Sequence, residues 1–313
     1  LLFFVMGTIY YLRWTGPEVM SASCVFIASI AILRGEIALA FFMSGLGATQ
    51  NPSIIFMMPL AFGYGALIYW RPQLACLGKA PSRPSCRDCL LALSGIFLGL
   101  MPYAFFQMNF LTPSLIAQYG AYPSLISANR LFSLFLDLNQ GMIIGLPGLV
   151  FALFPGFFLS DSLHRTRWLT AAILLIIITV VMAVPTLSTG NWNPGGLVML
   201  RYNYWLGMPL LALLILGLIL LPRARARAFF FLALFFQGLV LAGQRIEQSS
   251  YTQHTPLARW VLRKFPKLYN PEAEIFFERS IGREDRYTID SEYLYKSGGH
   301  PLKLLRHWSN FSE

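Results

Sequence analysis

The residues best suited to chemistry lie in a polar, aromatic and glycine-rich stretch, Ser188 to Trp205 (STGNWNPGGLVMLRYNYW), which separates two strongly apolar runs. Arg201 and Tyr202 come just before the second run. A guanidinium at such a boundary binds a phosphate group through two parallel hydrogen bonds and keeps its charge permanently. Asn191 and Asn193 stand beside a Pro-Gly-Gly turn in the same stretch. We expect these four side chains to bind a substrate.

An ordinary membrane interface offers a second interpretation of this stretch. Arg201 would then reach lipid headgroups or pair with Asp137, and the aromatic residues would form an interfacial belt. The belt accounts for the aromatic residues but not for the asparagines and glycines gathered beside them. Both interpretations stay open at the level of sequence.

A second polar group, Asp137-Leu138-Asn139-Gln140-Gly141, closes a long loop over 107–141. We expect Asp137, Asn139 and Gln140 to face a polar cavity and hydrogen-bond the hydroxyl groups of a sugar. Asp137 is also a candidate general base, because a carboxylate can take a proton from a reacting hydroxyl. The alternative is that Asp137 only caps the helix that follows.

The same loop carries a second candidate cation. Apolar residues over 127–138 are spaced for one face of a helix, and Arg130 lies off that face. Such a helix is expected to lie along the membrane surface. There Arg130 becomes a further candidate for substrate binding.

These residues must be positioned by membrane helices, because 56% of the chain is hydrophobic and only 12% is charged. The net charge of +10 does not indicate a nucleic-acid partner, since most of the cations before residue 244 fall in four clusters between apolar runs. This distribution is typical of cytoplasmic loops. The clusters are Arg34, then Arg71, Lys79, Arg83 and Arg87, then Arg165 and Arg167, then Arg223, Arg225 and Arg227.

The apolar runs predict an all-α polytopic membrane domain over residues 1–243, with about nine membrane segments at roughly 20 residues per span. External loops are expected at 107–141 and 187–204. The predicted segments are 1–12, 19–33, 37–48, 53–70, 88–106, 142–160, 167–186, 205–222 and 227–243.

Residues 244–313 are predicted to form a small extracytoplasmic α+β domain, because they contain no apolar run long enough to span a membrane. Residues 256–265 have the spacing of a short amphipathic helix. Short strands are expected around 275–277, 287–289 and 293–295, with a turn at Ser297-Gly298-Gly299.

The sequence predicts neither a metal nor a nucleotide cofactor. Cys76, Cys86 and Cys89 share one loop but lack a nearby fourth ligand for a closed zinc site. They are therefore expected to be reduced thiols. The four histidines have no metal-ligand spacing, and no phosphate-binding glycine motif occurs.

The order of these motifs resembles bacterial integral membrane glycosyltransferases of the GT-C superfamily. The resemblance rests on a short helix followed by a TQNP turn and a return helix, on DLNQG, and on NWNPGG followed by RY, and it covers most of residues 1–243. It implies transfer of a sugar from a polyprenyl-phosphate donor to an acceptor on the outer face of the bacterial inner membrane. Membrane lipids are the other expected partners, and whether the chain has a protein partner is left open.

The catalytic base of that superfamily is an Asp or Glu in the first external loop. The matching region here holds only residues 13–18, so Glu18 is a weak candidate beside Asp137, and the chain is expected to lack an N-terminal part. Two other classes remain open: a flippase or transporter of a lipid-linked sugar, and a non-catalytic membrane subunit.

Overall fold

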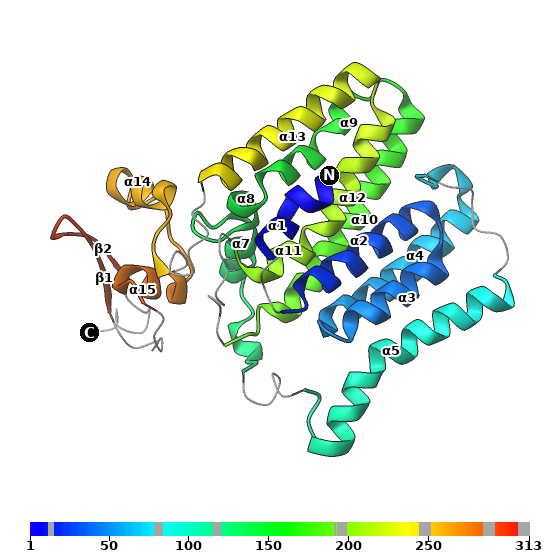
Figure 1. Cartoon of the computed structure of the whole chain (residues 1–313), viewed down its shortest axis with the longest axis horizontal. Coiled ribbons are helices and arrows are strands. Elements are labelled where there is room, and N and C mark those ends of the chain that lie inside the picture. Colours follow the sequence, from blue (N-terminus) through cyan, green and yellow to red (C-terminus); the bar gives the residue numbers. More distant parts are fainter. Residues whose placement is uncertain are drawn as a thin grey trace.

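The computed structural model describes residues 1–11, 16–77, 84–114, 120–190, 192, 199–243, 252–283 and 292–305. The structure is mostly helical. Figure 1 shows a bundle of helices with a small module, drawn in orange and red, at one end. The predicted residues Asn191 and Asn193 lie outside the described part of the chain.

Five helices in the described part of the chain are long and apolar enough to cross a membrane, which marks the chain as an integral membrane protein. The predicted count of nine is not confirmed. The five are Pro52–Trp70 (the 3-10 helix η2, Pro52–Phe56, continued by α4, Met57–Trp70), α5 (Cys86–Phe110), α10 (Ser162–Thr186), Arg201–Leu220 (α11, Arg201–Leu206, continued by α12, Met208–Leu220) and α13 (Arg223–Gly243).

The N-terminal segments are shorter than the five spans. Residues 1–11 contain a π-helical turn, η1 (Phe4–Thr8), and one further turn, α1 (Ile9–Tyr11), with non-helical backbone at Met6 and Gly7. α2 (Glu18–Arg34) and α3 (Ile37–Ala48) have 17 and 12 residues. The prediction of a short helix over 37–48 is confirmed, with Pro52 in the first turn of the return helix.

The predicted membrane helix over 142–160 is instead three short pieces, α8 (Met142–Gly145), η5 (Pro147–Leu153) and α9 (Pro155–Phe158). Pro147 and Pro155 explain the breaks, because proline lacks an N–H and clashes with the preceding turn. Broken backbone of this kind is tolerated at membrane depth when it is buried in protein. Here η5 packs against both α12 and α13.

The centre of the bundle is the Arg201–Leu220 helix, which is the most buried of the five spans. α12 packs on α2, α10 and η5. Its apolar residues therefore contact protein on most sides, whereas α5 and α13 lie along opposite edges of the bundle in Figure 1 and expose most of their residues. Such apolar outer faces are suited to lipid contact.

Two glycines allow α5 to pack against α3. A Cβ on Gly45 would lie 1.9 Å from the Gly95 carbonyl oxygen, and a Cβ on Gly95 would lie 2.5 Å from the Phe41 carbonyl oxygen. Only glycine lets the two backbones come this close. Small residues at crossings of this kind are typical of helices that associate in membranes.

The C-terminal module contains two helices, α14 (Pro256–Lys264) and α15 (Ala273–Ile281), and an antiparallel hairpin of β1 (Tyr293–Ser297) and β2 (His300–Leu305). The predicted helix, the strand near 293–295 and the glycine turn are confirmed. The strand predicted at 275–277 is wrong, because these residues lie within α15, which Glu272 caps by accepting hydrogen bonds from the backbone of Glu274 and Ile275. Residues 287–289 lie outside the described residues.

The remaining short elements are the 3-10 turns η3 (Pro72–Leu74) and η4 (Pro123–Leu125) and the helix α7 (Ala128–Leu136). α7 confirms the helix predicted in the second half of the long loop. Its first turn is capped by the Ser127 hydroxyl, which accepts from the Arg130 N–H.

Candidate functional site

Two of the predicted site residues, Glu18 and Arg201, lie around one tyrosine. Glu18 begins α2, Arg201 begins α11, and these two helices pack against each other. Both side chains lie within electrostatic range of Tyr11. The Tyr11 ring in turn stacks on Tyr204, with 4.9 Å between ring centroids and 8° between ring planes. We call these four residues, together with Thr8, the Glu18–Arg201 cluster.

The Glu18 side chain carries an unused acceptor. Glu18 is 6% exposed, and its Oε2 atom is buried with no hydrogen-bond partner among the described residues. An unsatisfied buried acceptor costs about 1–3 kcal/mol, and the Glu18 Oε2 atom is one of several such buried polar atoms in the described residues. Its position at the start of α2 partly offsets that cost through the helix dipole.

Arg201 is half-buried and is available to a ligand. Its guanidinium carbon lies 5.4 Å from the centroid of the Tyr202 ring, and no carboxylate among the described residues forms a salt bridge with it. Tyr202 contacts Trp205 edge to face. The predicted pairing of Arg201 with Asp137 is not found, because Asp137 uses its oxygens elsewhere.

The backbone at Gly7 lets this cluster form. Gly7 has φ of +116°, and a Cβ there would lie 2.5 Å from Tyr204 Cδ2. The next residue, Thr8, donates its hydroxyl hydrogen to the Phe3 carbonyl at 2.8 Å. The Tyr204 hydroxyl, 2.6 Å from Thr8 Oγ1, must therefore donate to Thr8. This bond fixes the ring on which Tyr11 stacks.

Asp137 belongs to a second group, at the junction with the C-terminal module. It is 1% exposed. Its Oδ1 accepts from the backbone N–H groups of Asn139 and Gln140 at 2.7 and 3.1 Å, and its Oδ2 accepts from the Tyr269 hydroxyl at 2.9 Å. Asp137 thus closes the turn over 137–140 and also binds the module, whereas the alternative interpretation, in which it caps the following helix, is wrong, because Gly141 holds the N-cap position of α8.

The amides next to Asp137 also make contacts within the protein. Asn139 donates to the Tyr269 hydroxyl at 2.6 Å and accepts from the Thr255 N–H at 3.1 Å. The Gln140 carbonyl accepts from the Leu200 N–H and from the Asn203 side chain, at 2.9 and 3.0 Å. Gln140 therefore joins this junction to the first turn of α11, which carries Arg201.

Arg130 lies in the same junction and is buried. Its Nε donates to Glu272 at 3.3 Å, its Nη2 lies 3.6 Å from Glu274, and its Nη1 donates to the carbonyls of Leu187 and Thr189. The guanidinium also lies 4.9 Å from the Trp192 ring. These contacts tie α7 to the C-terminal module, and the role predicted for Arg130 in substrate binding stays a prediction.

Burial shifts the ionisation of the groups in this junction. Loss of solvent raises the pKa of Asp137 and of Glu272, and the hydrogen bonds and nearby cations only partly oppose that effect. Burial, aided by Arg279 and Arg259, lowers the pKa of His254 to about 3. His254 is therefore neutral at physiological pH, with its Nδ1 3.3 Å from the Asn139 side-chain oxygen.

Sequence reasoning did not find the junction partners Tyr269, His254, Glu272 and Glu274. They lie more than 80 residues from the residues they contact. The one local sequence signal for this junction was the Glu272-Ala273-Glu274 spacing at the start of α15. It places two carboxylates close together, and a buried arginine requires such partners to compensate for the loss of solvent.

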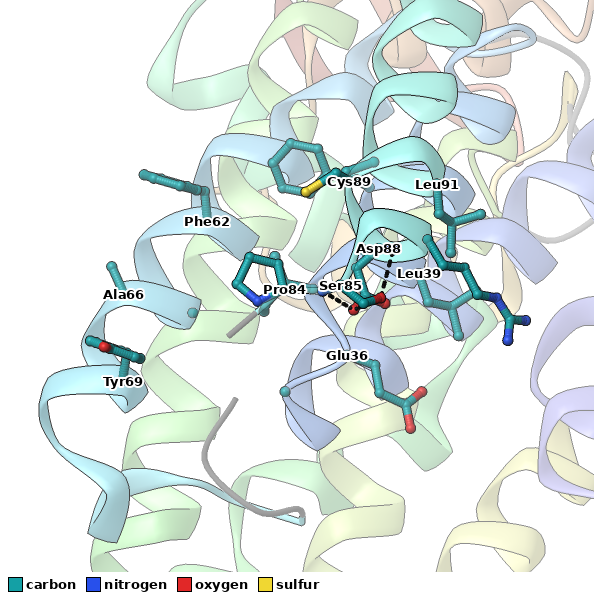
Figure 2. Close-up of a pocket in the computed structure, with 17 residues that line it drawn as sticks. Glu36, Leu39, Phe62, Ala66, Tyr69, Pro84, Ser85, Asp88, Cys89 and Leu91 are labelled. Atoms are coloured by element: carbon teal, nitrogen blue, oxygen red, sulfur yellow. Dashed lines mark hydrogen bonds between the residues drawn. The ribbon is translucent and has the colours of Figure 1, made fainter. Parts of the chain in front are cut away.

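A groove of about 1160 Å³ opens between α3, α4 and the start of α5 (Figure 2). Its lining is mainly apolar, and the Asp88 carboxylate at its rim accepts two hydrogen bonds from Ser85. Gly35 and Glu36, which line it, follow the last residue of α2, whereas Glu18 is the first. The groove is therefore at the opposite end of α2 from the Glu18–Arg201 cluster.

No family model, no curated protein and no solved structure shows a significant match to this chain. Function is therefore inferred from the two groups of residues described above. No cluster of three or more His, Cys, Asp or Glu side chains suited to a metal occurs within the described residues.

Proposed function

We propose that this protein is a membrane glycosyltransferase that moves a sugar from a polyprenyl-phosphate donor to an extracytoplasmic acceptor. The observation that carries the proposal is the Glu18–Arg201 cluster. Among the described residues, the buried Glu18 carboxylate has an oxygen without a hydrogen-bond partner and Arg201 has no carboxylate partner, and both side chains lie within electrostatic range of Tyr11. A carboxylate and a cation are the two charges that this reaction requires. The resemblance to the GT-C superfamily supports the same class.

In the proposed reaction, Glu18 accepts the proton of the acceptor hydroxyl as a general base. The acceptor oxygen forms a bond to the anomeric carbon while the bond from that carbon to the phosphate oxygen breaks. The bonding electrons leave with the polyprenyl phosphate, and Arg201 stabilises the negative charge that develops on it. The sugar is transferred and the proton remains on Glu18.

Glu18 is a better candidate for this base than Asp137. Both oxygens of Asp137 accept hydrogen bonds from the protein, and one of the donors belongs to the C-terminal module. A base needs a lone pair directed at its substrate. Only Glu18, of these two carboxylates, has an oxygen without a hydrogen-bond partner in the described structure.

The proposed setting is the bacterial inner membrane, with the cluster and the C-terminal module on the outer side. The distribution of cations supports this orientation. The cations Arg34 and Arg71 lie at the far ends of α2 and α4, opposite to Glu18, and clustered cations favour the cytoplasmic side.

The test is transfer of a radiolabelled sugar from polyprenyl phosphate to extracted envelope acceptors by the purified full chain in lipid. Arg201→Ala is expected to lower the rate about 10²–10³-fold, as loss of a charge-stabilising group does, and Arg201→Lys to restore part of it. The matched control is Arg71→Ala, which removes an exposed cation at the end of the bundle opposite to Glu18. This variant should leave the rate unchanged.

Full transfer activity in Arg201→Ala would remove the phosphate role. A wild-type protein that binds the labelled donor and moves it between leaflets without transfer would contradict the enzyme and favour the flippase.

A further inference from the structure

One face of the C-terminal module exposes large apolar side chains to solvent. Leu257 and Trp260 on α14, and Phe265 and Leu268 just after it, are 45%, 49%, 48% and 79% exposed. Trp260 and Phe265 contact each other edge to face, with 5.8 Å between ring centroids. The opposite side of α14 is buried through Ala258 and Leu262. We call these four exposed residues, with the cations described next, the α14 face.

The α14 face is strongly cationic. Residues 256–268 (PLARWVLRKFPKL) contain four cations and no acidic residue. All four cations are exposed: Arg259, Arg263, Lys264 and Lys267. At 100° per residue, Trp260 lies in the middle of the exposed side of α14, with Arg263 on one flank and Lys264 on the other. A tryptophan flanked by cations is the arrangement found where helices lie on anionic membranes.

The α14 face is fixed to the membrane domain. The Thr255 side chain, which caps α14, donates to the Leu138 carbonyl at 2.7 Å, and its N–H donates to Asn139. These residues lie a few positions before α8, at the edge of the helical bundle. The membrane helix α13 ends at Gly243 and α14 begins at Pro256, and Figure 1 shows α14 beyond the C-terminal end of α13.

The turn that follows α14, which carries Phe265 and Leu268, is held in place by hydrogen bonds from the hairpin. Lys303 on β2 donates to the carbonyls of Pro266 and Tyr269 and to the Asn270 side chain. These bonds fix the turn after α14, in which Phe265 and Leu268 are 48% and 79% exposed. The exposure therefore follows from a fixed backbone.

We propose that the α14 face docks on the anionic headgroups of the adjacent membrane leaflet. Trp260, Phe265 and Leu268 enter the interface, while Arg259, Arg263, Lys264 and Lys267 contact lipid phosphates. The module is thereby held against the bilayer through a surface separate from its junction with the bundle. This inference does not depend on the proposed sugar transfer.

The experiment is a nitroxide accessibility measurement on the full chain in nanodiscs. The background is Cys86→Ser with Cys89→Ser, because the other two cysteines, Cys24 and Cys76, are buried. One nitroxide is attached at Leu268→Cys, and the matched control at Leu304→Cys on β2, which is 44% exposed and outside the α14 face. Collision with a water-soluble nickel reagent and with oxygen is measured in phosphatidylcholine, with and without phosphatidylglycerol.

With phosphatidylglycerol present, the label at position 268 should lose collisions with the nickel reagent and gain collisions with oxygen, while the label at 304 stays unchanged. Replacing the four cations by glutamine should abolish this change, and the circular dichroism spectrum checks that this variant is folded. Equal accessibility at 268 in both lipid mixtures overturns the proposal. So does protection that persists in the glutamine variant or in detergent, which would indicate a protein contact.

Discussion

At the scale of single residues, the arrangement of the Glu18–Arg201 cluster depends on Gly7. Its φ of +116° lies in a region that side chains with a Cβ rarely adopt, and its missing Cβ makes room for the Tyr204 ring. Glu18 was a candidate only through the resemblance to the GT-C superfamily, whereas Arg201 and Tyr202 were identifiable from sequence as a charged and an aromatic residue at an apolar boundary. Tyr11 and Tyr204 were not, because nothing in the sequence shows that two distant tyrosines stack.

Gly7→Ala tests this dependence. The new methyl group would meet Tyr204 at 2.5 Å and the backbone would be strained, so we expect a loss of about 1–3 kcal/mol in stability together with loss of activity. Thermal unfolding in detergent and the transfer assay measure the two effects. The control is Gly63→Ala, which has nothing within 4 Å of the new methyl group and should be neutral or slightly stabilising.

At the scale of elements, hydropathy predicted the long helices well and the broken ones poorly. Uninterrupted apolar runs such as 170–184 gave α10, because length and apolar character are enough to specify a spanning helix. The run over 142–160 is also strongly apolar, but it contains prolines and glycines, and the structure divides it into α8, η5 and α9. A hydropathy profile counts apolar residues and therefore does not reveal such breaks. The breaks are tolerated because the irregular backbone is buried in protein.

The contact between α3 and α5 yields a prediction at this scale. Gly95→Val would place side-chain atoms against the Phe41 backbone, so we expect α5 to separate from α3 at a cost of about 1–3 kcal/mol. Protease sensitivity of the segments flanking α5 reports the separation. Gly238→Val on the outer helix α13, where a Cβ meets nothing within 4 Å, is the control. Equal sensitivity of the two variants would contradict this account of the packing.

At the scale of the whole molecule, a buried polar junction couples the C-terminal module to the bundle. Asp137, Asn139 and Arg130 were singled out from sequence as substrate-binding residues, and the structure gives them contacts with Tyr269, Glu272 and Glu274. Sequence reasoning recognised that these residues were unusual but could not supply their partners. The partners come from a separate module, whose position relative to the bundle has no local sequence signal.

This junction makes the attachment of the module pH-dependent. His254 has a pKa of about 3 when docked and about 6.5 when exposed, so the released form binds the proton between these values. The contribution of neutral His254 to docking is therefore fully present above pH 6.5, and it falls by up to about 1.4 kcal/mol for each pH unit below that value. The raised pKa values of Asp137 and Glu272 act in the opposite sense, so the His254 contribution must be isolated by substitution.

His254→Asn isolates this contribution. We expect amide hydrogen exchange in α14 and α15 to accelerate more between pH 7.5 and pH 5 in the wild type than in the variant, after correction for the intrinsic exchange rates. His300→Asn, an exposed histidine on β2, should behave like the wild type. An identical pH response in wild type and His254→Asn would show that His254 does not control docking.

The central claim is that Glu18 is the base of a sugar transfer, and Glu18→Gln tests it most directly. Glutamine keeps the shape of the side chain but cannot accept the proton, so the single-turnover transfer rate should fall about 10²–10⁴-fold with donor binding unchanged. The control is Glu36→Gln, which breaks only an exposed ion pair with Arg34 and should keep the wild-type rate. A Glu18→Gln protein that transfers sugar at the wild-type rate would contradict the account.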